Sequence, residues 1–209
     1  MHRLLSIPSG DLLALSDTLA TLSHFVQFQG VTPGVDYLLR VVHRIVYGKG
    51  RRDIRFILIG EGPEWQGLKR YCSKLKLDSY VTFTRRVSDK EMVEYLSTCD
   101  VCVNPDVVNE FNDKSTMNKV LEYMVLGKPI VQFDMVEGRY SAQKASLYAN
   151  PNDEVDFAQK ILELLGNAEK RKEMDDYGRQ RVEKQLQWKF SEKELLRAYR
   201  SLFSVNPWT

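Results

Sequence analysis

Short apolar runs alternate with amphipathic stretches along most of this chain. The run RFILIG at 55–60 is apolar and ends in Gly, and VCVN at 101–104 has the same character. Between such runs, apolar residues recur at helical spacing, as in 34–50, where Leu38 and Ile45 share one face. Apolar runs of this length favour buried strands, and the longer periodic stretches favour helices.

The alternation predicts six strands joined by helices. The strands are expected at 24–30, 55–60, 80–84, 101–104, 129–134 and 146–149. Helices are expected at 34–50, 63–76 and 88–99, from about Ser115, near 138–145, and through the last sixty residues. The expected helix N-caps are Ser88, Asp153 and Ser191.

This cadence indicates right-handed crossovers and a parallel sheet covered on both faces. We therefore expect one α/β domain at 24–209, doubly wound, with extra C-terminal helices. The segment 1–23 contains DLLALSDTLATL, a helical pattern, and is expected to be a remnant or a linker. Ligands of such sheets bind beyond the carboxyl ends of the strands. Three loops are thereby singled out: 60–64, 84–89 and 104–116.

The composition is that of a globular chain with little net charge. Of 209 residues 43% are hydrophobic, and 30 basic against 28 acidic side chains give a net charge of +2. This balance excludes a broad nucleic-acid footprint, so any anion site must be local. No apolar run is long enough to span a membrane, and the N-terminus lacks the apolar core of a signal peptide. Three cysteines fit a reducing compartment, so we expect a cytoplasmic protein.

The tetrapeptide CDVC, with Cys99 and Cys102, has the spacing of a zinc half-site. The chain has no second pair, and its three histidines are distant in sequence. Two half-buried thiols that flank a strand are the better interpretation, and no metal is expected.

The loop GEGPEW begins like a dinucleotide fingerprint, with Gly60 and Gly62. The third glycine would fall at position 65, which is Trp65, and the loop follows the second strand instead of the first. NAD is therefore not expected. Either the small residues let another ligand approach the backbone, or the loop is only a tight turn.

Arg85 and Arg86 come directly after a predicted strand, in TRRV. Loop arginines are usually solvated. At this edge of the sheet they are also candidates for an anionic ligand.

The stretch NDKSTMNKVLEYM at 112–124 concentrates polar residues at the start of a predicted helix. On a wheel that starts at Ser115, Lys119 and Glu122 share one stripe, opposite an apolar arc. The first-turn N–H groups would hold a phosphate, with Ser115 or Thr116 as cap or contact and Lys119 adding charge. Glu122 could accept hydrogen bonds from vicinal sugar hydroxyls. The alternative is a capped helix whose Lys and Glu face water.

Several segments together resemble a known family. They are RFILIGEGPE, YVTFTRRVSDKEM, STCDVCVNPD, NDKSTMNKVLEYMVLGKPIVQFD and EGRYSAQKASLYANPND. They look like the C-terminal, donor-binding half of retaining GT-B glycosyltransferases, the group 1 or family-four enzymes. The resemblance runs from about residue 24 to the end and is most specific over 101–153.

In that family a nucleotide-sugar lies in the cleft between two Rossmann-like domains. The resemblance implies that Ser115 and Thr116 sit at the phosphates, that Lys119 flanks them, and that Glu122 binds the ribose. It implies a UDP- or GDP-linked sugar as substrate, with no separate cofactor.

The same resemblance assigns the two earlier loops to the nucleotide. Gly60–Gly62 and Arg85–Val87 would line it, and Val87 would offer its backbone to the base.

Two departures from the family pattern affect the expected catalytic charge. Many members carry two glutamates separated by seven residues, and the position of the first is Lys114 here, with Glu110 four residues upstream. Many also place Arg and Lys after the first strand, whereas FQGVTPGVDYLL at 28–39 has neither. The charge that meets the leaving diphosphate would then come from Lys114, Lys119 and Arg85. The two lysines are our catalytic candidates.

A full enzyme of this type also needs an acceptor domain. We expect a fragment, a truncated product or one partner of a split enzyme, inactive in transfer alone, whose missing half supplies acceptor contacts and any peripheral membrane association. Two alternatives remain. One is a non-catalytic nucleotide-binding or interaction module that kept the fold. The other is half of a nucleotide-sugar epimerase, which would turn over the sugar nucleotide without an acceptor.

Overall fold

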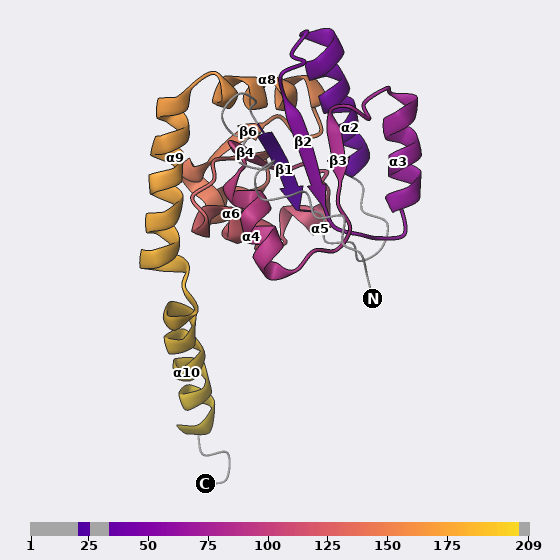
Figure 1. Ribbon diagram of the computed structural model, residues 1–209. Helices are drawn as coiled ribbons and strands as arrows, with labels where there is room; N and C mark the ends of the chain where they lie inside the picture. Colours follow the sequence, from indigo (N-terminus) through magenta and orange to yellow (C-terminus); the bar gives the residue numbers. More distant parts are fainter. Residues whose placement is uncertain (1–20, 26–33, 205–209) are drawn as a thin grey trace.

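A computed structural model describes residues 21–25 and 34–204 of the chain. Its strands form one six-stranded sheet in the order β3-β2-β1-β4-β5-β6, and all neighbouring pairs are parallel (Figure 1). The strands are β1 (Thr21–Phe25), β2 (Arg55–Ile59), β3 (Val81–Phe83), β4 (Val101–Asn104), β5 (Ile130–Phe133) and β6 (Ser146–Ala149). The predicted doubly wound parallel sheet is confirmed.

Helices connect the strands and extend the chain beyond them. Those up to β5 are α2 (Val35–His43), the π-helical η1 (Arg44–Gly48), α3 (Trp65–Lys74), α4 (Asp89–Ser97), α5 (Glu110–Asp113) and α6 (Asn118–Val125). Those after β5 are α7 (Val136–Ala142), η2 (Gln143–Ala145), α8 (Glu154–Leu165), α9 (Ala168–Arg181), η3 (Val182–Leu186) and α10 (Trp188–Ser204).

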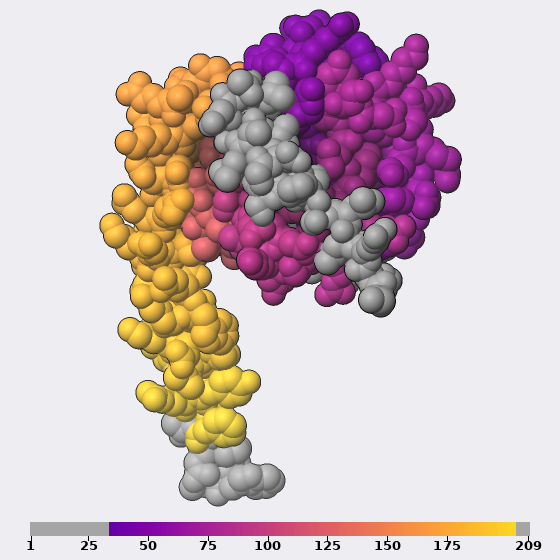
Figure 2. Space-filling model, in the orientation of Figure 1, coloured from indigo at the N-terminus to yellow at the C-terminus, as the bar shows by residue number. Residues whose placement is uncertain are grey.

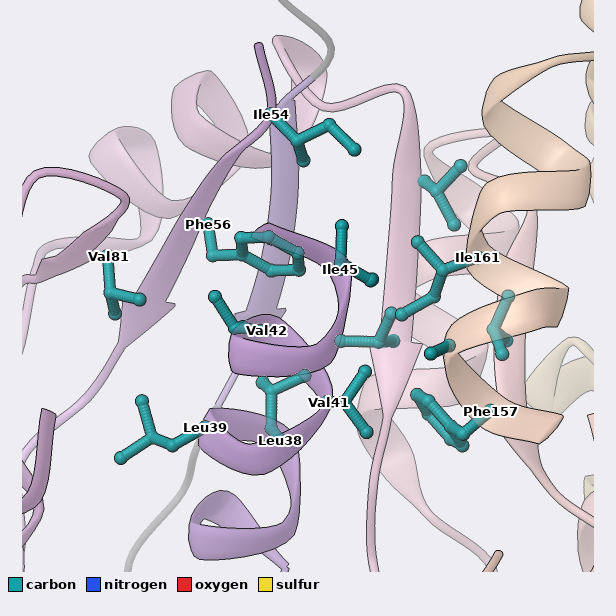
Figure 3. Close-up of a cluster of buried hydrophobic side chains, with 14 of the residues drawn as sticks. Leu38, Leu39, Val41, Val42, Ile45, Ile54, Phe56, Val81, Phe157 and Ile161 are labelled. Atoms are coloured by element: carbon teal, nitrogen blue, oxygen red, sulfur yellow. The ribbon is translucent and has the colours of Figure 1, made fainter. Parts of the chain in front are cut away.

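Strands β4 and β5 are buried along their whole length and β2 along most of it, which explains why these strands are mainly apolar instead of alternating. Val103 and Phe133 pack with α2 and α8 in the larger core cluster. Cys102 and Ile130, on the opposite face of the same two strands, pack with α4, α6 and α9. Figure 3 shows the larger cluster, in which α2 lies between strand β2 and helix α8 and Phe157 points inward from α8.

Two of the three predicted N-caps are confirmed. Ser88 forms a reciprocal capping box with Glu91 at the start of α4. Asp153 accepts hydrogen bonds from the first turn of α8. The third prediction is wrong, because Ser191 lies inside α10, which begins at Trp188.

The first strand begins earlier than predicted. Its first residue is Thr21, so residues 21–23, which we assigned to the N-terminal segment, belong to the sheet. Pairing decides the register, because Thr21 lies opposite Arg55 at the start of β2. Residues 26–30 of the strand expected at 24–30, and all but the last three residues of the segment expected at 1–23, lie outside the described residues.

The strand order reverses between β1 and β4, and the loops predicted to bind a ligand lie around this reversal. From β1 the chain moves outward through β2 and β3, then crosses to the other side of β1 through β4, β5 and β6. In a parallel sheet all carboxyl ends meet at one edge, and a crevice forms there at the reversal. The loops after β2, β3 and β4 therefore share one edge.

Helix α10 projects from the body of the domain as an arm (Figures 1 and 2). Large apolar side chains are exposed along it: Trp188, Leu195, Leu196, Tyr199, Leu202 and Phe203. An exposed apolar stripe of this kind is typical of an interaction surface.

Candidate functional site

The loops after β2 and β3 lie side by side at the carboxyl edge. Trp65 Nε1 donates to the carbonyl oxygen of Thr84 at 3.2 Å. The guanidinium of Arg85 lies 5.2 Å from the centroid of the Trp65 ring. Arg85 also approaches the Glu61 carboxylate, at 3.8 Å. Trp65, the residue that breaks the dinucleotide pattern, is thus the side chain that joins the two predicted nucleotide loops.

The glycines of the first loop form a tight turn. Gly60 has φ +139°, a conformation that favours glycine, and the Gly62 carbonyl accepts from the Trp65 N–H at 3.0 Å. The turn accounts for Gly60 without a ligand, so a binding role for these glycines stays a prediction. In the neighbouring loop Arg86 is exposed and Val87 is half-buried.

We expected one helix to begin at about Ser115, within the stretch 112–124. The structure instead has two short helices there. Helix α5 ends at Asp113 and α6 begins at Asn118. The Ser115 hydroxyl donates back to the Phe111 carbonyl at 2.6 Å, and Thr116 donates to Glu137 Oε1 at 2.7 Å. Neither residue caps α6. Its N-cap is Met117, whose side chain makes no capping hydrogen bond. Hydroxyl side chains near a helix start can bond either the helix N–H groups or other nearby acceptors. Here both hydroxyls bond other acceptors.

Lys119 is not a lone positive charge. Its Nζ lies 2.7 Å from Asp106 Oδ2, and the two side chains are only 14% and 15% exposed. Asp106 comes from the loop after β4, thirteen positions earlier in the chain, and our sequence analysis did not identify it. A charge pair between a loop and a separate helix leaves no periodic signal in the sequence.

Glu122 is a carboxylate of the candidate site whose pKa is raised above its usual range. Burial raises its pKa, the nearby Asp89 carboxylate raises it further, and Lys119 acts in the opposite direction. Within the described part of the chain, its Oε2 is buried and has no hydrogen-bond partner. Asp89 begins α4, directly after the loop that carries Arg85–Val87, so the end of that loop lies near enough to Glu122 for the two carboxylates to repel each other. A half-buried carboxylate short of donors is suited to accept hydrogen bonds from ligand hydroxyls.

Lys114 lies at the rim and is also paired. Its Nζ is 3.0 Å from Glu110 Oε1, and both side chains are well exposed. Together with Phe111 and Ser115, this pair lines a surface hollow of about 510 Å³. Phe111 is itself 79% exposed. The structure therefore gives each catalytic candidate lysine a carboxylate partner, Asp106 for Lys119 and Glu110 for Lys114.

The cysteines lie in the core. Cys99 and Cys102, which we expected to be half-buried, are buried, and so is Cys72. In the described residues, no three His, Cys, Asp or Glu side chains gather as metal ligands would. None of the described helices combines the length and apolarity needed to cross a bilayer.

Comparison with known proteins identifies the type of domain. Residues 19–167 match the family model for group 1 glycosyl transferases. An uncharacterised glycosyltransferase of Methanocaldococcus jannaschii is 27% identical over 161 residues, which are 74% of this chain and 41% of that protein.

Solved structures show the same fold at low identity. Sucrose-phosphate synthase from Thermosynechococcus elongatus superposes with a TM-score of 0.77 and 19% identity, over 94% of this chain and 49% of that one. S. aureus TarM, solved as a variant in complex with UDP, gives a TM-score of 0.70 and 19% identity, over 90% of this chain and 36% of that one. The chain thus spans half or less of the length of these relatives.

The environment of Glu122 predicts a pH-dependent gain of stability in Glu122→Gln. Because its folded-state pKa lies above the unfolded value, the ionised carboxylate costs folding free energy at neutral pH. Protonation removes that cost as the pH falls through the folded pKa. Thermal unfolding should show a variant more stable than the wild type at pH 7, with the difference shrinking toward acid. Glu173→Gln, an exposed site on α9, is the control. A variant that loses stability at pH 7 would contradict this account and make Glu122 a structural residue.

Proposed function

Because the chain belongs to the group 1 glycosyltransferase family, we propose that it binds a nucleoside-diphosphate sugar at the carboxyl edge of its sheet. The sugar would be transferred to a hydroxyl acceptor. The crevice at the β1–β4 reversal is where sheets of this topology bind nucleotides.

The unsatisfied carboxylate of Glu122 is the observation that carries this proposal. Glu122 lies four residues into α6, about 6 Å along its axis at the standard rise. A ribose placed there would satisfy Oε2 with its vicinal hydroxyls. Its base would then lie against the loop of Arg85–Val87, and Gly60–Gly62 would border it.

The diphosphate would lie at the start of α6. The first turn of this helix has no side-chain cap, and its N–H groups and dipole favour an anion. Lys119 lies in that turn and Lys114 precedes it, while Ser115 and Thr116 lie between them. Charge that develops on the leaving diphosphate would be met by these groups, so catalysis would be mainly electrostatic. The proposed donors are UDP- or GDP-linked sugars, and the UDP complex of TarM supports the first.

We propose that acceptor contacts come from a second domain, on the same or another chain. The chain matches only 41% and 49% of the length of two relatives. The exposed apolar stripe of α10 projects away from the body and is suited to pack against such a domain. Any peripheral membrane association would belong to that half.

One observation favours a second candidate, a non-catalytic nucleotide-binding module of this fold. At the position of the first family glutamate stands Lys114, bound to Glu110 at the surface. Such a module would keep the nucleotide site and lack transfer even with its second domain present.

The binding proposal predicts that the chain prefers UDP to UMP. The second phosphate would reach the helix N-terminus and the two lysines. Isothermal calorimetry should show UDP binding at least about tenfold more tightly, equal to about 1.4 kcal/mol. The preference should fall as salt rises, because partly exposed charges are screened. Equal affinity for UDP and UMP at low salt would contradict the proposed diphosphate site.

The same proposal predicts that this chain alone transfers no sugar at an appreciable rate. Holding donor and acceptor together can account for about 7–11 kcal/mol of a barrier, and the acceptor side would be absent. Purified protein incubated with UDP- and GDP-sugars and simple acceptors should give at most slow hydrolysis of the donor. Robust formation of glycosylated product by the chain alone would refute the requirement for a second domain.

A further inference from the structure

The ion pair between Lys119 and Asp106 is among the least exposed in the described part of the molecule. The 2.7 Å contact joins helix α6 to the loop that follows β4, and both side chains are about 15% exposed. By comparison, Lys170 and Glu163 form a pair of similar length at the surface, where the side chains are 33% and 43% exposed.

The backbone around Asp106 is held in place from the other side. Gly34, the N-cap of α2, has φ +147°, where glycine is favoured. A Cβ at this position would lie 2.8 Å from the Pro105 carbonyl oxygen and 3.3 Å from the Asp106 Cα. The start of α2 therefore packs directly against the loop, with no side chain between them. This contact restrains the backbone of the loop that carries Asp106.

Burial makes the Lys119 charge depend on its partner. A largely desolvated ammonium without an opposite charge is costly, and breaking such a pair from one side is much worse than removing both partners. Lys119 has three donors, and Asp106 occupies one of them at the observed distance. The remaining donors are available to a second anion at the start of α6.

We propose that Asp106 is a positioning residue that holds Lys119, charged and oriented, toward the diphosphate. This inference rests on the proposed function, because it needs a diphosphate at the start of α6. Without Asp106, the Lys119 ammonium would turn outward to water, and its contact with the diphosphate would be lost.

The proposal and simple charge repulsion predict opposite changes in UDP affinity when Asp106 is removed. Asp106 is a negative charge beside a proposed anion site, so by charge alone its removal should tighten UDP binding. If Asp106 acts through Lys119, its removal should weaken UDP binding, although the site becomes more positive.

The test is a double-mutant cycle on UDP and UMP affinity by calorimetry. Asp106→Asn and Lys119→Met should each weaken UDP binding about tenfold. The double variant should be no weaker than either single variant, because all three remove the same contact. UMP affinity should change much less, so the ratio of the two affinities should fall. A general loss of structure would not select between the two ligands in this way. Glu163→Gln, which breaks the matched surface pair, should leave both affinities unchanged.

Each other outcome has a distinct meaning. Wild-type protein that binds neither UDP nor GDP overturns the proposed function itself, and protein that binds only GDP is tested by the same cycle with GDP and GMP. Wild-type protein that binds UDP, with Asp106→Asn as tight or tighter, overturns only the role of Asp106. If Asp106→Asn does not fold, the double variant, which leaves no unpaired charge, decides. Its UDP affinity should equal that of Lys119→Met, and tighter binding would show that Asp106 merely repels the ligand.

Discussion

The parallel pairing of β4 with β1 determines where every candidate group in this molecule lies. It sets the reversal in strand order, and it brings the loops after β2, β3 and β4 to one edge. Helix α6 packs against β4, so that Lys119 reaches the loop after β4 and Glu122 lies near Asp89 at the start of α4. The apolar clusters on both faces support the strands from which these loops extend, and a binding site needs such support.

Charge at this edge is arranged in pairs. Lys119 is bound to Asp106, Lys114 to Glu110, and Arg85 lies near Glu61. Carboxylates therefore partly offset the cations near the proposed diphosphate site. An incoming anion must compete with these carboxylates or share the cations with them. Glu122 is the exception, because it is partly desolvated and its Oε2 has no hydrogen-bond donor.

Most of the fold could be predicted from the sequence because local sequence patterns mark its strands and helix starts. The strands at 55–60 and 101–104 are buried on both faces, and such runs are apolar wherever they occur. Ser88 and Asp153 cap helices that follow them directly in sequence. The break between α5 and α6 was missed, because Ser115 and Thr116 suit a cap as well as a turn, and the acceptors at Phe111 and Glu137 decided between them. Asp106 was missed for a related reason. Its partner is set by how helix α6 packs against the loop after β4, and no spacing rule connects positions that far apart. The family resemblance named the ligand type, whereas the contacts that restrain the lysines came only from the structure.

The central claim is that a nucleotide binds at this edge, and mapping bound UDP onto the backbone tests it most directly. Titrating UDP into isotope-labelled protein and following amide chemical shifts would show which segments respond. The account predicts that the largest changes cluster at 60–62, 84–89 and 114–122, with Glu122 and Lys119 among them. Changes confined to other surfaces, such as α8 and α9, would place the nucleotide elsewhere and contradict the account.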